Sequence, residues 1–112
     1  MAIYVIEQPA TPKQMEEMLK EYGHYIKLAV DLKKGILAGG GELHADCEAV
    51  LLEKGSLQED IWGADWLPKS KEVRFGSLIN IRPKQNNSSM EVQDKKLRSQ
   101  IETIVRTLLE KQ

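Results

Sequence analysis

Residues 24–38, HYIKLAVDLKKGILA, decide the fold that we predict for this chain. Apolar side chains alternate with polar or small ones through the first part of the stretch, at Ile26, Leu28, Val30 and Leu32. This alternation is typical of a half-buried strand over 24–32. The turn at 33–35 offers a glycine that can adopt positive φ, and residues 36–38 begin the returning strand. The stretch therefore predicts a β-hairpin within an antiparallel sheet.

Helical patterns lie on both sides of this hairpin. Thr11 and Gln14 have the spacing of a capping box, with Pro12 at the first helical position, so we expect a helix over about 12–22. Asp94 is a good N-cap for a second helix over about 95–110. The second helix has an apolar stripe at helical spacing, formed by Leu97, Ile101, Ile104, Val105 and Leu108.

Several further stretches are rich in strand-forming residues. We predict strands over 2–6, 42–52, 57–62, 73–82 and 89–93, with a loop over 63–71. Few of these strands are separated by crossover helices, which favours the α+β class. The expected fold is a mainly antiparallel sheet of five or six strands packed with an N-terminal and a C-terminal helix. With 112 residues, we expect one soluble domain over 1–112.

Charge and composition narrow the function classes. Sixteen basic and seventeen acidic residues leave a net charge of -1, which argues against nucleic-acid binding by the domain as a whole. The apolar runs are far shorter than the roughly 20 residues of a membrane span, so we expect no membrane association. The single cysteine, Cys47, forms no internal disulfide, and this agrees with a cytoplasmic location.

One row of side chains is the best candidate for chemistry. On a strand over 42–52, alternate side chains share a face, which places four polar groups together: Glu42, His44, Asp46 and Glu48. Carboxylates and an imidazole suit a divalent ion such as zinc, manganese or iron, so the cofactor of this hypothesis is a divalent metal. The alternative is the wet face of an ordinary antiparallel sheet, and we prefer it.

The predicted strand over 73–82 carries the next candidates. Its polar face holds Arg74, Asn80 and Arg82, which can orient the acidic row or anchor an anionic substrate. Simple cross-strand charge pairing is the alternative. We assign Arg82 to the hypothetical catalytic group, with His44, Asp46 and Glu48. Asn80 belongs to the candidate ligand-binding residues.

Glycines and tryptophans complete the candidate ligand-binding set. Gly39, Gly40 and Gly41 interrupt the predicted hairpin, which indicates a bulge, a bend or the close approach of another group to the backbone. Trp62 and Trp66 are interpreted either as the wall of a pocket and a partner anchor or as core residues. By strand parity, Cys47 is expected to be a small buried hydrophobe.

The chain resembles a family of small uncharacterised bacterial proteins that carries a domain-of-unknown-function label. Four stretches carry the resemblance: GGGELHADCEAVLLEKGS (39–56), QEDIWGADW (58–66), INIRP (79–83) and SMEVQD (89–94). It implies a bacterial or archaeal source and a free-standing domain. It implies no activity, cofactor or site residue.

Three functional hypotheses follow from the sequence. The first is a cytoplasmic domain whose sheet face and tryptophan loop bind a partner or a second copy, as a homo-oligomer. The second is a metal-assisted or acid/base hydrolase that uses the row from Glu42 to Glu48. The third is an RNA-binding module that uses Arg74, Arg82 and Lys84.

Overall fold

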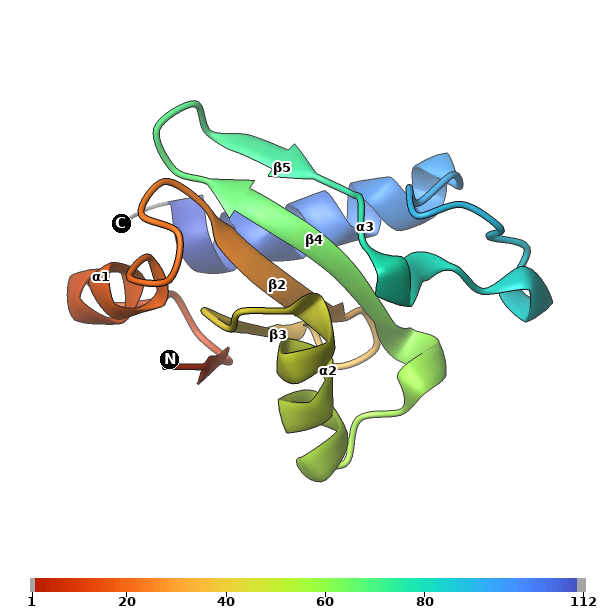
Figure 1. The fold of residues 1–112 in the computed structure, drawn as a ribbon, viewed down its shortest axis with the longest axis horizontal. Coiled ribbons are helices and arrows are strands. Elements are labelled where there is room, and N and C mark those ends of the chain that lie inside the picture. Colours follow the sequence, from red (N-terminus) through yellow and green to blue (C-terminus); the bar gives the residue numbers. More distant parts are fainter. Residues whose placement is uncertain (1, 111–112) are drawn as a thin grey trace.

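The computed structural model describes residues 2–110 and confirms the α+β class (Figure 1). Its strands are β1 (Tyr4–Ile6), β2 (Ile26–Asp31), β3 (Ile36–Gly39), β4 (Ile61–Leu67) and β5 (Glu72–Arg74). Its α-helices are α1 (Pro12–Met18), α2 (His44–Glu53) and α3 (Lys95–Val105), and α3 continues as a π-helical turn at Arg106–Glu110. Short 3-10 turns occur at Gln58–Asp60 (η1), Leu78–Asn80 (η2) and Pro83–Gln85 (η3).

The five strands form one antiparallel sheet in the order β1-β3-β2-β4-β5. The predicted hairpin is confirmed, since β2 and β3 pair from Leu28 opposite Gly39 to Asp31 opposite Ile36. Its turn is fixed by the Asp31 carboxylate, which accepts hydrogen bonds from the backbone N–H groups of residues 33 and 34, both at 2.9 Å. Gly35 closes the turn with a φ of 69°.

The two predicted terminal helices are also confirmed. The Thr11 hydroxyl accepts from the Gln14 N–H at 3.1 Å, and the Gln14 side chain accepts from the Thr11 N–H at 2.9 Å, which completes the capping box. Asp94 caps α3 through Lys96 N–H at 2.7 Å. Helix α1 is shorter than predicted, since it ends at Met18 and residues 19–22 form turns.

The helices cover opposite faces of the sheet. In Figure 1, α3 runs behind the strands and α2 lies in front of them. The α3 face carries the larger apolar core, which includes Ile26, Leu28, Val30, Trp62, Trp66 and Ile101. The α2 face carries a smaller core of Ala29, Ala38, Cys47, Leu51 and Ile61. Alternation along each strand produces this division. None of the helices in residues 2–110 has the length and apolar character needed to cross a membrane.

The strand predicted over 42–52 is wrong, because residues 44–53 form α2. The Asp46 carboxylate accepts from the Leu43 N–H at 3.1 Å and so stabilises the start of this helix. Cys47 and Leu51, four residues apart, then pack together on the sheet. Period-two and period-four patterns coexist in this short stretch, and burial against the sheet selects the helix.

Four predictions for the chain after α2 also need correction. The strand over 57–62 and the loop over 63–71 are replaced by η1 and β4, so most of the predicted loop up to Leu67 is a central strand. The strand over 73–82 is reduced to β5, and η2 follows it. The strand over 89–93 is reduced to an isolated bridge between Gly76 and Glu91. Hydrogen bonds from side chains, rather than a regular strand ladder, hold this region to the rest of the protein.

Candidate functional site

The four polar residues of the predicted row do not share a face. Glu42 precedes α2, and the other three lie on α2, where successive residues turn by about 100°. His44 contacts Asp65, Asp46 caps its own helix, and Glu48 pairs with Arg82. Within residues 2–110, no group of three or more His, Cys, Asp or Glu side chains is arranged to hold a metal ion. The predicted strand face is therefore wrong, and with it the ligand set of the metal hypothesis.

His44 forms a short polar contact with β4 on the α2 face. Its Nε2 lies 2.8 Å from Asp65 Oδ1 and 3.2 Å from the Ala64 carbonyl oxygen. The two side chains are only 12% and 15% exposed. With Nε2–H donating to both oxygens, Nδ1 is the nitrogen left to accept a proton or a hydrogen bond. This arrangement orients an imidazole at the surface, as an acid/base group requires.

Cations on the neighbouring strands lie on either side of Asp65. In the sheet register, Asp65 is opposite Lys27 of β2 and Arg74 of β5. Partial burial disfavours the charged form of Lys27, but Tyr22, Tyr25 and Asp65 outweigh it and raise the pKa of Lys27 above its ordinary value. Lys27 is therefore a stable cation beside the carboxylate.

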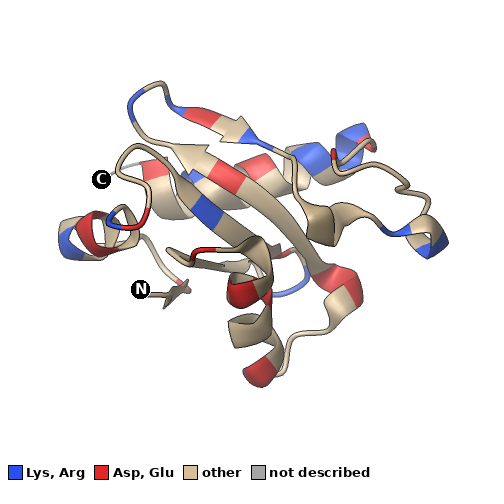
Figure 2. Ribbon diagram, viewed as in Figure 1, with Lys and Arg blue, Asp and Glu red and all other residues tan. Residues whose placement is uncertain are grey.

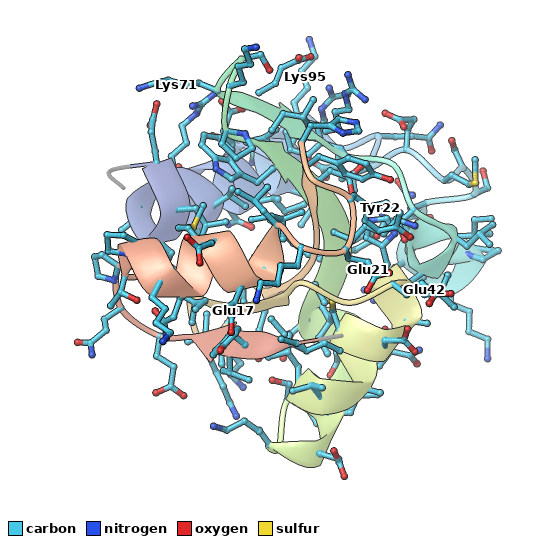
Figure 3. The ribbon with its side chains drawn as sticks, turned by 60° about the vertical axis from the view of Figure 1, so that its left-hand side comes forward. Glu17, Glu21, Tyr22, Glu42, Lys71 and Lys95 are labelled. Carbon is cyan, nitrogen blue, oxygen red and sulfur yellow. The ribbon has the colours of Figure 1, made fainter. Side chains whose placement is uncertain are left out.

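Two tyrosines from the segment between α1 and β2 border this polar area. The rings of Tyr22 and Tyr25 stack with centroids 4.8 Å apart, and Lys27 Nζ lies 4.9 Å from the Tyr22 centroid. The Tyr22 hydroxyl donates to the Glu42 carbonyl oxygen at 2.6 Å, and Figure 3 shows these two residues on the same side of the molecule. Sequence reasoning missed the tyrosines because they come from a connection far from α2 in the chain.

Arg82 is a buried link between three segments. Its Nε donates to the Ile79 carbonyl oxygen at 2.9 Å and its Nη1 to the Gln58 carbonyl oxygen at 2.6 Å, while Nη2 lies 3.4 Å from a Glu48 carboxylate oxygen. Its guanidinium also lies over the Trp62 ring, 4.8 Å from the centroid. Burial lowers the pKa of Arg82, and the nearby Glu48 carboxylate opposes this effect. Since Arg82 is engaged inside the protein, it does not join the exposed stripe that the RNA hypothesis requires.

Asn80 is fully buried and fastens the segment after β5 to the sheet. Its Oδ1 accepts from the Gly63 N–H at 2.8 Å, and its Nδ2 donates to the carbonyl oxygens of Gly63, Phe75 and Met90 at 3.0, 3.1 and 3.2 Å. Asn87 in turn donates to the Asn80 carbonyl oxygen at 2.8 Å. The amide of Asn80 thus holds residues 76–91 against β4.

The predicted close approach at the triple glycine is real, and the approaching atoms belong to the protein. A Cβ on Gly39 would lie 2.7 Å from the Leu28 side chain, and one on Gly41 would lie 3.1 Å from Cys47 Sγ. Gly40 has a φ of 102°, and a Cβ there would meet the Ala2 carbonyl oxygen. These glycines allow β3 and the following turn to pack against their neighbours.

The core interpretation of the tryptophans and the cysteine is confirmed. Trp62 and Trp66 are each 2% exposed and belong to the core under α3, so they form no surface loop. Cys47 is fully buried, and burial raises the pKa of its thiol to about 11. The thiol is therefore protonated and unreactive near neutral pH.

Exposed apolar side chains gather on the segments that Arg82 links. We define the apolar rim as Leu52, Leu57, Leu78 and Ile81, which are 41%, 52%, 73% and 43% exposed. Leu52 lies on α2, Leu57 precedes η1, and the other two flank or belong to η2. Because Arg82 contacts α2, η1 and the end of η2, these side chains are carried by one connected region.

The contacts above also join the sequence stretches that carry the family resemblance. His44 meets Asp65, Glu48 meets Arg82, and Asn80 meets both Gly63 and Met90. Neither the curated proteins nor the solved structures include a match to the chain. A family described as "Protein of unknown function (DUF5674)" matches residues 4–108. The match covers nearly the whole chain, which therefore belongs to the DUF5674 family.

Proposed function

We propose that this protein is a cytoplasmic binding module that associates with a second copy of itself through the apolar rim. The observation that carries the proposal is the exposure of Leu78, at 73%, on a turn whose neighbours Asn80 and Arg82 are buried. A single free thiol, Cys47, agrees with the reducing compartment. The tryptophan loop of our first hypothesis has no part in this proposal, because both rings are in the core.

The rigidity of the rim supports binding. The contacts of the Asn80 and Arg82 side chains described above are seven in number. Six are made to backbone or carboxylate oxygens and one to a backbone N–H. A surface that is already ordered loses little conformational entropy when a partner covers it. Exposed leucines on such a surface are favourable anchors for an interface, since burial removes their apolar area from water.

The charges around the rim support a second copy as the partner. Acidic positions lie along α2 and at η1, and Figure 2 shows them on both elements. Lys84 lies on η3, which is next to η1 because Gln85 donates to the Glu59 carbonyl oxygen at 3.0 Å. In a two-fold symmetric pair, the acidic side of one copy can face the basic side of the other.

Sedimentation equilibrium over a concentration series tests the proposal. We expect a reversible dimer for the native chain and a large loss of dimer for a Leu78→Ser/Ile81→Ser double variant. Leu57→Ser should weaken the dimer as well. The matched control is Leu43→Ser, because Leu43 is also 52% exposed but lies at the opposite end of α2 from Leu52. A strict monomer at every concentration, or equal weakening by the control, would refute the proposal.

A second candidate function rests on the contact between His44 and Asp65. We propose it as an acid/base site, in which Asp65 orients the imidazole and His44 Nδ1 accepts a proton from a substrate or a water molecule. Lys27 and Arg74 would attract an anionic substrate to the same area. A hydrolase screen should then show activity that His44→Gln and Asp65→Asn both abolish. His24→Gln, at the other histidine, is the control and should retain it; equal activity in all variants would exclude the role.

A further inference from the structure

A groove between α3 and the end of β5 is separate from both sites above. It encloses about 460 Å³. One wall is Phe75, and the other is a polar face of α3 on which Lys95, Arg98, Ser99 and Thr103 follow one another at spacings of one to four residues. These side chains share a face because three- and four-residue spacings bring helix positions together. The groove is thus lined by three cations, two hydroxyl groups and one carboxylate, since Arg106 and Glu102 also line it.

Arg98 is the central side chain of the groove. Its guanidinium carbon lies 4.5 Å from the centre of the Phe75 ring, and Phe75 itself is only 7% exposed. Within residues 2–110, neither Arg98 nor Lys95 forms an ion pair with a carboxylate. The ring therefore supports the guanidinium on one side, and its N–H donors remain available to a ligand.

The one carboxylate that lines the groove is paired with an arginine of the same helix. Glu102 lies 2.8 Å from Arg106 Nε, and Arg106 also lies 3.1 Å from Glu110 and donates to the Lys71 carbonyl oxygen at 2.9 Å. This pairing with Arg106 reduces the repulsion that Glu102 exerts on an anion. The first turns of α3 appear blue in Figure 2, and these turns carry Lys95 and Arg98.

We propose that this groove binds the phosphate group of a small phosphorylated molecule. Arg98 and Lys95 would neutralise the phosphate, and the hydroxyls of Ser99 and Thr103 would donate to its remaining oxygens. A phosphate monoester fits better than a carboxylate, since it offers three oxygens and close to two negative charges at neutral pH. The aromatic support under Arg98 preserves the planar donor geometry that phosphate recognition uses.

Calorimetric titration of the full chain with a sugar phosphate at low ionic strength tests this proposal. We expect binding of one molecule per chain, and no binding of the same sugar without phosphate. Arg98→Ala and Lys95→Ala should each weaken binding about tenfold or more, the scale expected for loss of a charge-assisted contact. The matched control is Lys96→Ala, because Lys96 is the next residue on α3 and does not line the groove.

Further arms separate the sources of phosphate and exclude unfolding. Inorganic phosphate should compete with the sugar phosphate, and a single-stranded RNA should bind no more tightly per phosphate than the small ligand. Binding of RNA alone, binding of neither, or equal affinity in Arg98→Ala would overturn the proposal. Arg98→Lys retains the charge but loses the planar fork, so it should fold normally in a thermal melt and still bind more weakly. The Leu78→Ser/Ile81→Ser variant should bind the sugar phosphate unchanged, which keeps this test independent of self-association.

Discussion

The two faces of the sheet use different physics to hold the same strands. On the α3 face, large side chains such as Leu28, Trp62 and Trp66 pack in a continuous apolar layer against Ile101. On the α2 face, small residues lie under the helix, and beyond them the strands carry the charged residues Lys27, Asp65 and Arg74. The first face gains stability in proportion to the apolar area buried.

The α2 face depends instead on directional contacts. His44 to Asp65, Glu48 to Arg82 and Asn80 to Gly63 each connect α2 or the segment after β5 to another part of the chain. Such contacts contribute less free energy than a packed core, but they fix positions of polar groups. The comparison shows that the α3 face supplies most of the apolar packing of the sheet. The α2 face can therefore carry polar side chains and exposed apolar side chains.

The strongest test of this division is Trp66→Ala. We expect the free energy of unfolding to fall by about 3–5 kcal/mol, since the substitution leaves a cavity in the core under α3. Urea denaturation would measure it. Trp66→Phe is the control, because the buried Trp66 Nε1 has no hydrogen-bond acceptor within the described residues. The phenylalanine variant should stay within about 1.5 kcal/mol of the native chain; a loss as large as that of alanine would contradict this interpretation.

Asn80→Ala tests the directional side of the comparison. The substitution removes four hydrogen bonds and leaves the Gly63 N–H and C=O groups without their partner. We expect a loss of about 2–4 kcal/mol in urea denaturation. Asn86→Gly is the control, since Asn86 is exposed with a φ of 60°, a conformation that glycine adopts easily. Equal effects of the two variants would show that the buried amide is not needed.

Alkaline pH should weaken the α2 face through Cys47. Burial raises the pKa of the folded thiol to about 11, above the roughly 8.5 of an exposed thiol. Below the pKa of the unfolded thiol, Cys47 is protonated in both the folded and the unfolded chain, so its full contribution to stability is present. As pH rises toward the pKa of the folded thiol, the unfolded chain loses its proton first, and this contribution to stability is lost. Between about pH 8 and 10 the native chain should lose about 2 kcal/mol more than a Cys47→Ala variant. Parallel pH dependence of the two proteins would contradict this.

The smallest effect should come from the contact between His44 and Asp65. A double-mutant cycle with His44→Gln and Asp65→Asn should give a coupling free energy of about 1 kcal/mol, because both side chains retain some exposure. Chemical denaturation of the four proteins at one pH would measure it. The pair of His24 and Asp65 is the control, and a coupling of the same size there would mean that the cycle does not report a direct contact.

The N-terminal hairpin and the terminal helices could be predicted because their signals are local. The alternation in β2, the turn at Gly35, the Thr11 capping box and the Asp94 cap each act within a few residues. Interactions at this range are visible in the order of residue types. The apolar stripe of α3 was equally clear.

Residues 42–93 were predicted poorly because their structure depends on distant partners. The alternation around Cys47 is compatible with a strand, and only packing of Cys47 and Leu51 on the sheet makes the helix preferable. Asn80 reaches Gly63, and Arg82 reaches Gln58 and Glu48, across 17 to 34 residues. The candidate residues His44, Arg82 and Asn80 were therefore found by type, but their partners were not.

The bonds between Asn80 and Gly63 also affect how this protein meets other chains. β5 pairs with β4 only from Asp65 to Leu67, so Gly63 would present an open sheet edge to a strand from another molecule. The Asn80 amide occupies its N–H and C=O groups, and Ser77 lies so close that even a Cβ on Gly63 would be only 2.6 Å from it. An open edge of this kind is a template for strand addition and amyloid-like aggregation. At Gly63, a single buried amide thus protects the part of the β4 edge that a longer β5 would otherwise cover.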